Sequence, residues 1–287
     1  VRYAVSENIT GPYREIHRSM EEPILQRDDK NHILGPGHHS MFDYEGRTFI
    51  AYHRQHYPFV DSKRQTCIDE VFFNPDGSIQ KIRPTHKGVM VTTKVPADKR
   101  INIALGKQTL VSSAREYDSS VFEPRYRTHD ISFRYNGNYA VDENYGTRWD
   151  AGVGATNPWL IVDLGSNCRV DEIETIFEFT SRTYLYKLEY LSQKEASSLS
   201  EASQSDAWKI FADRSKSGVE KSPVTDTPAK KSPVKARFIR LTIAGAVNLP
   251  PTADGLDKVN AENSLSIFEL KVFGKDRKSK AGIHRSK

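Results

Sequence analysis

The chain has 287 residues, a formal net charge of +5 and 37% hydrophobic residues. No apolar run approaches the ~18 residues that a spanning helix needs, so a helical membrane span is excluded. Aromatic residues are abundant, with 13 Tyr and 13 Phe, and apolar residues at helical spacing are missing. This composition is typical of an all-β protein, and the length favours two domains.

The first domain is expected over residues 1–95, as short strands separated by turns. Strands are predicted over 1–6, 47–53, 67–73 and 78–83, the last two joined by the turn Asn74-Pro-Asp-Gly77. Between the first two lies Gly35-Pro-Gly-His-His-Ser40. Its glycines let the backbone approach a neighbour closely, and its two imidazoles stand at the mouth of a predicted hairpin.

Residues 96–100 are predicted to be a linker, and residues 101–275 a second domain. Its strands are expected over 159–164, 170–176, 186–190, 208–211, 236–243 and 267–273, with 192–205 and 216–235 as long surface loops. Many short strands at near-regular spacing indicate a sandwich or jelly roll.

The two cysteines, Cys67 and Cys168, are interpreted as small buried side chains rather than a disulfide. Residues 276–287 form a basic tail, for which a solvated, disordered end is a simpler interpretation than contact with an anionic surface. Aromatic and basic residues do not interleave as in RNA-binding domains, so no nucleic acid partner is predicted.

The order of motifs in the first domain resembles the last blades of family 43 glycoside hydrolases. These motifs are residues 1–13, Ile24-Leu25, Gly35–Ser40, Ile50–Arg54, Ile68–Val71 and Pro75–Gly77. The resemblance implies part of a five-bladed β-propeller, about two blades here, that hydrolyses arabinofuranosides, xylosides or arabinan with inversion. It also implies an extracellular or periplasmic location.

That resemblance places His38, or as second choice His39, at the floor of the active site, with Arg54 near the same mouth. In arabinanase-like members this histidine helps to hold an axial metal ion through water. The alternative for the histidine is a side chain whose hydrogen bonds are satisfied within the core. The alternative for Arg54 is a position at the rim. Asp69 and Glu70 are adjacent on a strand, so they point to opposite faces and cannot form an acid–base pair.

The family takes its catalytic carboxylates from earlier blades, upstream of Val1 in this numbering. The chain alone is therefore expected to be inactive, with the N-terminal blades of its own parent chain as a partner.

Four ordered motifs in the second domain resemble the factor V/VIII type C (discoidin) domain, whose fold is shared by carbohydrate-binding modules of family 32. They are Tyr139–Gly152, Pro158–Gly165, Ala236–Leu241 and Ile267–Gly274. The resemblance implies an antiparallel jelly-roll sandwich. Many members carry calcium, and here Asp142, Thr147 and Glu269 would be its ligands. Glu143 stands where the loop usually has glycine, and an Asx-type turn without an ion is the alternative.

Sugar recognition needs an exposed aromatic ring with polar neighbours. Trp149 and Trp159 are family framework positions, so the candidates are Tyr126, Tyr135 and Tyr184, with Arg182 beside them. The sequence thus predicts the C-terminal fragment of a glycosidase that hydrolyses O-glycosyl bonds of plant cell-wall polysaccharide or oligosaccharide, with an appended carbohydrate-binding module. The alternative is a non-catalytic binding or adhesion module that carries a propeller remnant.

Overall fold

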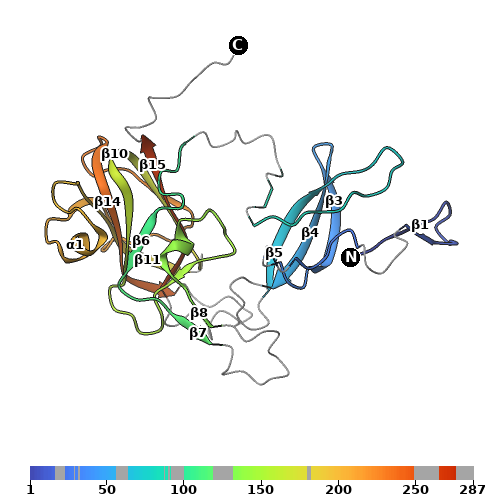
Figure 1. Cartoon of the computed structure of the whole chain (residues 1–287), viewed down its shortest axis with the longest axis horizontal. Coiled ribbons are helices and arrows are strands. Elements are labelled where there is room, and N and C mark those ends of the chain that lie inside the picture. The colour runs from blue at the N-terminus through green and yellow to red at the C-terminus, as the bar shows by residue number, and fades with distance from the viewer. Residues whose placement is uncertain are drawn as a thin grey trace, which may run out of the picture. The chain divides into compact units, whose positions relative to one another are not determined.

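The computed structural model describes residues 1–16, 23–28, 30–31, 33–55, 64–86, 88–89, 91, 100–118, 132–179, 182–248 and 265–275. Within these ranges the protein is all-β apart from one short helix and one 3-10 turn (Figure 1). Its contacts divide it into two compact units, Val1–Asp98 and Lys99–Lys287. Among the described residues, no helix is long and apolar enough to cross a membrane.

The first unit is built on a three-stranded antiparallel sheet. It consists of β3 (Gly37–Tyr44), β4 (Arg47–Gln55) and β5 (Arg64–Val71), which follow one another as a meander (Figure 1). A separate ribbon pairs β1 (Ala4–Val5) with β2 (Arg14–Glu15). One face of the meander is closed by a small core of Ile24, Leu25, Ile50, Tyr52, Cys67, Val71 and Ile82. The small antiparallel sheets of this unit are consistent with the predicted part of a β-propeller.

Two strand predictions for this unit are wrong in extent. The first run forms a strand only at Ala4–Val5. The run over 78–83 makes a single bridge, between Phe73 and Ile79, and no strand. Its backbone leaves the hairpin because the amide of Ile82 donates to the carbonyl of Ile24 at 2.7 Å. This segment therefore closes the core instead of extending the sheet.

The second unit is an antiparallel β-sandwich. Its elements are β6 (Gln108–Val111), β7 (Glu116–Asp118), β8 (Ser132–Arg134), the 3-10 turn η3 (Gly137–Ala140), β9 (Trp149–Asp150), β10 (Trp159–Phe177), β11 (Arg182–Leu191), α1 (Leu199–Gln204), β12 (Lys209–Asp213), β13 (Val224–Asp226), β14 (Val234–Asn248) and β15 (Ser266–Lys275). The main order is β12-β11-β14-β10-β15-β9, while β6 and β13 also pair with β10 and β7 pairs with β8.

The strand β10 connects the two halves of the sandwich. The sequence predicted two strands here, and the structure shows one strand of 19 residues with a register shift between Asp163 and Cys168. Before the shift β10 pairs with β6 and β14, and after it β10 pairs with the start of β14 and then with β13 and β15. At the shift, Asp163 accepts the amide of Gly165 at 2.7 Å and two bonds from Arg237 at 2.9 Å. The bend therefore allows one strand to pair with strands of both layers of the sandwich.

The predicted loop over 192–205 contains the helix α1, which is a correction. Ser198 caps it by accepting the amide of Glu201, and Glu201 accepts the amide of Ser197 at 2.8 Å. This spacing of Ser and Glu is a helix-start signal that the sequence analysis missed. Ala202 of α1 packs in a core cluster with Ile161 and Phe238. The predicted loop over 216–235 likewise contains β13.

The larger core of the second unit surrounds Trp149, which is fully buried and donates its ring N–H to the carbonyl of Ser113 at 2.9 Å. Trp159 packs against the α1 cluster, so both tryptophans are framework residues as predicted. Cys67 and Cys168 are buried and are not joined in a disulfide, which confirms their interpretation as small core side chains.

Candidate functional site

A loop rich in oxygen ligands follows η3 in the second unit. Gly137 lets η3 pack tightly, because a Cβ there would lie 2.5 Å from Leu160 Cδ1. After η3 the chain turns through Asp142 and Glu143, whose φ is +52°. The backbone amide of Asn144 then donates to Asp142 Oδ1 at 2.9 Å and to Glu269 Oε1 at 3.0 Å. The structure thus brings the predicted calcium ligands together.

The hydroxyl of Thr147 lies among more oxygens than it can satisfy. Its Oγ1 is 3.0 and 2.8 Å from the two carboxylate oxygens of Asp142. It is also 2.8 Å from the carbonyl oxygen of Asn144 and 3.3 Å from that of Tyr139. A hydroxyl has one hydrogen, so most of these contacts are between acceptors. A cation at this position would satisfy them.

Glu269 completes the cluster from β15. Its side chain is fully buried, and its Oε2 receives no hydrogen bond. Burial and the facing carboxyl of Asp142 raise the pKa of Glu269 to about 9, and burial also raises the pKa of Asp142. Two carboxyls that face each other, one buried and one half-buried, need a shared proton or a cation. The donor set therefore fits a hard cation such as calcium, which prefers carboxylate, hydroxyl and carbonyl oxygens.

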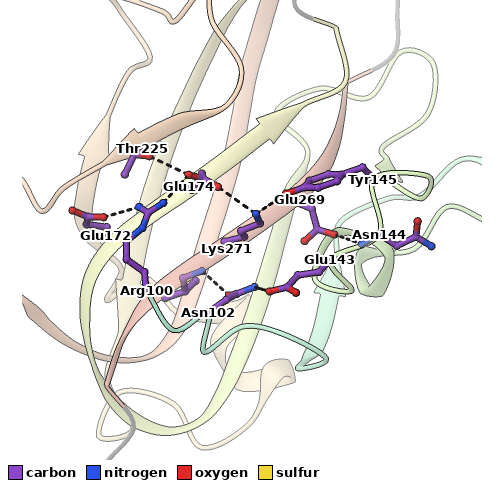
Figure 2. A network of polar contacts seen from close by, with 11 residues as sticks. Arg100, Asn102, Glu143, Asn144, Tyr145, Glu172, Glu174, Thr225, Glu269 and Lys271 are labelled. Atoms are coloured by element: carbon purple, nitrogen blue, oxygen red, sulfur yellow. Dashed lines mark hydrogen bonds and ion pairs between the residues drawn. The ribbon is translucent and has the colours of Figure 1, made fainter. Parts of the chain in front are cut away.

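A polar network surrounds this loop on the sheet face (Figure 2). Lys271 Nζ donates to the hydroxyl of Tyr145 at 2.6 Å and lies 3.4 Å from Glu174. Asn102 donates to Glu143 at 3.3 Å and accepts the amide of Val272 at 3.1 Å. These contacts attach both ends of the loop's outer turn to the body of the sandwich.

The start of the second unit joins the same network. Arg100 pairs with Glu172 at 2.8 Å and with Glu174 at 3.2 Å, and its guanidinium lies 3.8 Å above the ring of Phe273. Figure 2 shows Arg100 and Lys271 converging on Glu174 from different segments. The network therefore ties the segment that enters the sandwich to β10 and β15.

Two predicted sugar-stacking tyrosines are not exposed, which is a correction. Tyr135 and Tyr184 are each 1% exposed, and burial raises the pKa of both to about 12. Tyr184 stacks on Phe177 with ring centres 3.9 Å apart. Arg182 is buried as well, with its guanidinium over the ring of Phe179. Arg182 and Tyr184 are both on the side of β11 that faces the core by strand alternation, so these two side chains are internal.

Tyr126 lies outside the described residues. The sequence analysis overlooked Tyr145, which is 37% exposed beside the oxygen-rich loop. A tyrosine between Asn144 and Gly146, in a turn sequence, was the available signal.

In the first unit, Arg54 is fully buried, so it is not a rim residue and does not reach an exposed sugar. It donates to Gln65 Oε1 and to the carbonyl of Thr85, each at 3.4 Å. Thr85 in turn donates through its hydroxyl to Asp69 at 2.6 Å, and Tyr52 donates to the same carboxylate at 2.6 Å. Burial, then the bond to Asp69, raise the pKa of Tyr52.

Asp69 and Glu70 face opposite sides of β5, as predicted. Asp69 is buried with Tyr52, while Glu70 accepts two bonds from Arg47 at 2.8 and 2.7 Å. Both carboxylates serve structural contacts. Among the described residues, no three His, Cys, Asp or Glu side chains gather as a metal site.

His38 and His39 are exposed on β3, at the mouth of the hairpin with β4. The ring of His38 lies 4.9 Å from that of His53, which the sequence analysis did not single out. Burial, Arg64 and His38 lower the pKa of His53. The described pocket of the unit, of about 670 Å³, lies elsewhere, between Arg27, Asp28, Lys81 and Arg83.

Comparisons with known proteins find a match for each unit. Residues 1–79 match the family model of the glycosyl hydrolases family 43. Residues 139–241 match the NedA-like, galactose-binding domain of the factor V/VIII type C group. The chain therefore combines a segment similar to family 43 with a sandwich similar to the type C domain.

Three individual proteins are similar to parts of this chain. A β-D-galactofuranosidase of Aspergillus niger is 34% identical over 93 residues, which cover 31% of this chain and 25% of that protein. A solved glycoside hydrolase matches 94% of this chain and 53% of its own, with 23% identity and a TM-score of 0.60. A family 32 module of Clostridium perfringens matches with 18% identity over 64% of this chain and 99% of its own, and a TM-score of 0.40. The chain thus spans a quarter to about half of the two longer relatives.

Proposed function

We propose that this chain is part of a secreted glycosidase that hydrolyses furanosyl or xylosyl bonds of plant polysaccharides with inversion, and that its second unit holds carbohydrate. The family 43 match over residues 1–79 carries this proposal. The similarity to a galactofuranosidase adds five-membered galactose rings to the arabinofuranosides expected from the sequence. An extracellular or periplasmic location follows from the same reasoning.

In this proposal the chain supplies support and binding rather than proton transfer. Inversion requires two carboxyl groups roughly 6.5–9.5 Å apart across the scissile bond. The described carboxylates of the hairpin, Asp69 and Glu70, are on opposite faces and are held by Tyr52 and Arg47. We therefore assign the acid and base to other parts of the longer protein, and His38 to the floor of the site, near an axial cation held through water.

We further propose that the second unit binds structural calcium. Asp142 and Glu269 would supply carboxylate oxygens, and Thr147 its hydroxyl, with the carbonyl of Asn144 beside it. Bound there, calcium would neutralise the carboxylates of Asp142 and Glu269 and hold the outer turn in place. The crowding of oxygens around the Thr147 hydroxyl supports an ion over a self-sufficient Asx turn.

The test is to incubate the purified chain with aryl arabinofuranosides, xylosides and galactofuranosides, and to measure its retention on arabinan and arabinoxylan in affinity gels. We expect retention without hydrolysis. Tyr126→Ala should reduce retention, whereas Tyr13→Ala, which changes an exposed tyrosine of the first unit, should preserve it. Hydrolysis by this chain would refute the assignment of the acid and base to other parts of the longer protein. Absence of retention on every glycan would refute the binding function.

A non-catalytic binding or adhesion module is the second candidate, favoured by the structural use of Asp69 and Glu70. It predicts retention by this chain but no glycosidase activity in the longer protein. Assaying that protein distinguishes the two.

A further inference from the structure

A cavity of about 670 Å³ lies in the first unit, between residues 26–31 and residues 81–84. Neither segment belongs to a strand of the three-stranded sheet. In the first segment, Asp28 and Ile33 exchange two backbone hydrogen bonds, at 2.9 and 2.8 Å. The turn that forms this wall is therefore held by its own backbone, and the wall exists without a ligand.

The other wall presents two cations. Ile82 is 5% exposed, and its amide donates to the carbonyl of Ile24 at 2.7 Å. Lys81 and Arg83, on either side of it, are exposed and line the cavity. Pro84 favours an extended backbone at the residue before it, which supports this alternation. Within the described part of the chain, neither Lys81 nor Arg83 pairs with a carboxylate, so two like charges line one cavity unneutralised.

The first wall adds a third cation, Arg27, and the single carboxylate among the described lining residues, Asp28. That carboxylate already accepts the side-chain amide of Asn31 at 2.7 Å and its backbone amide at 3.2 Å. These bonds, the side-chain bond first, lower the pKa of Asp28, so it is ionised at neutral pH. The described lining therefore carries three positive charges and one negative, and it suits an anionic ligand.

The rest of the lining favours a sugar acid over a small inorganic anion. Ile82 and Pro84 contribute apolar surface, against which the C–H groups of a sugar ring can pack. Gln26 and Asp28 offer oxygens to sugar hydroxyls, whereas the charge of Asp28 would repel a phosphate dianion. An arginine binds a carboxylate through two parallel hydrogen bonds. The volume also lies within the range of about 300–1,000 Å³ that is usual for small-molecule sites.

We propose that this cavity binds the carboxylate of a uronic acid branch on an acidic polysaccharide, through Arg27, Lys81 and Arg83. The proposal rests on the proposed function for the substrate class, a plant polysaccharide, and adds an acidic unit that the first unit holds by charge. Binding at this cavity requires neither hydrolysis nor calcium. Because the contacts are ionic and partly exposed, the affinity falls as the salt concentration rises.

The test is a calorimetric titration of the full chain with xylotriose that carries a glucuronic acid branch, and with unbranched xylotriose as the neutral control. We expect the acidic sugar to bind at least about tenfold more tightly. Lys81→Gln and Arg83→Gln should each weaken its binding by about tenfold, because each removes a charge-assisted hydrogen bond. Arg83→Lys should recover part of the affinity, since it keeps the charge but not the planar fork.

Lys230→Gln is the matched control, because it removes an exposed charge of the second unit, and it should leave the affinity unchanged. Circular dichroism of each variant checks that the fold is retained. Equal affinity for the acidic and the neutral sugar would overturn the proposal. So would undiminished binding in the double variant Lys81→Gln/Arg83→Gln, or binding of inorganic phosphate as tight as that of the acidic sugar.

The proposed function is tested separately, by retention on neutral arabinan and arabinoxylan. Loss of that retention with the acidic sugar still bound would refute carbohydrate binding by the second unit and support the cavity. Retention on the neutral glycans without binding of the acidic sugar beyond that of xylotriose would refute the cavity alone.

Discussion

Asp142 and Glu269 are joined by one backbone amide, since Asn144 N–H donates to a carboxylate oxygen of each, at 2.9 and 3.0 Å. One residue is in a loop and the other in the last strand. Their carboxyl groups face each other in a partly buried site, where like charges repel. We therefore expect a cation bound between them to attach the loop more firmly to β15.

Calcium should raise the melting temperature of the second unit. Ligand that binds only the folded state stabilises it by about 2.7 kcal/mol at one hundred times its dissociation constant. Adding chelator should reverse the gain, and Glu269→Gln should abolish it. Glu172→Gln, which changes an exposed partner of Arg100, should leave the gain intact. An identical melting curve with and without chelator would count against calcium.

The calcium-free protein should lose stability as pH rises from 4.5 to about 9. Glu269 has a pKa of about 9 when folded, against 4.5 for an ordinary glutamate. In that window the folded chain keeps a proton that the unfolded chain has released, so rising pH favours unfolding. The melting temperature measured in chelator should fall across the window, and Glu269→Gln should flatten the slope. A slope of the opposite sign would show that Glu269 is ionised in the folded state.

Tyr52→Phe should destabilise the first unit by roughly 1.5–3 kcal/mol, because it removes a hydrogen bond to the buried carboxylate of Asp69. Tyr44→Phe is the matched control, since Tyr44 is 41% exposed on β3. Amide hydrogen exchange in β4 and β5 measures the stability of the first unit in both variants. Equal protection in the two variants would mean that Asp69 is satisfied without Tyr52.

Gly137→Ala should destabilise the second unit by roughly 1–3 kcal/mol, because the added methyl group would overlap Leu160. The overlap also displaces η3, so calcium affinity should fall with it. Gly245→Ala is the control, because a Cβ there meets nothing within 4 Å. Thermal unfolding with and without calcium measures the stability and the affinity together. Indistinguishable behaviour of the two variants would contradict this role for η3.

Much of the architecture could be predicted from local patterns. Runs such as Arg47–His53 and Ile267–Phe273 are strands because alternating apolar residues fit a pleated surface, and the structure confirms both. The motif order in each half led to the families that the comparisons support. The opposite faces of Asp69 and Glu70 followed from the two-residue period of a strand alone.

The exposure of side chains required the tertiary structure. Tyr135 and Tyr184 have polar neighbours in the sequence, yet both are internal. Tyr184 is on the core-facing side of β11, and Tyr135 directly follows β8 and is covered by Arg148, whose guanidinium lies over its ring. The bend that makes β10 one strand depends on Arg237, which is 74 residues from Asp163 along the chain.

By itself, therefore, the sequence determined the all-β class, the two-part organisation and the candidate ligands Asp142, Thr147 and Glu269. Only the tertiary structure decided that these three meet, that Arg54 is buried and that His38 lies beside His53. The physical reason is that strand formation and turns depend on neighbouring residues. Burial and side-chain pairing depend on which distant strands pack together.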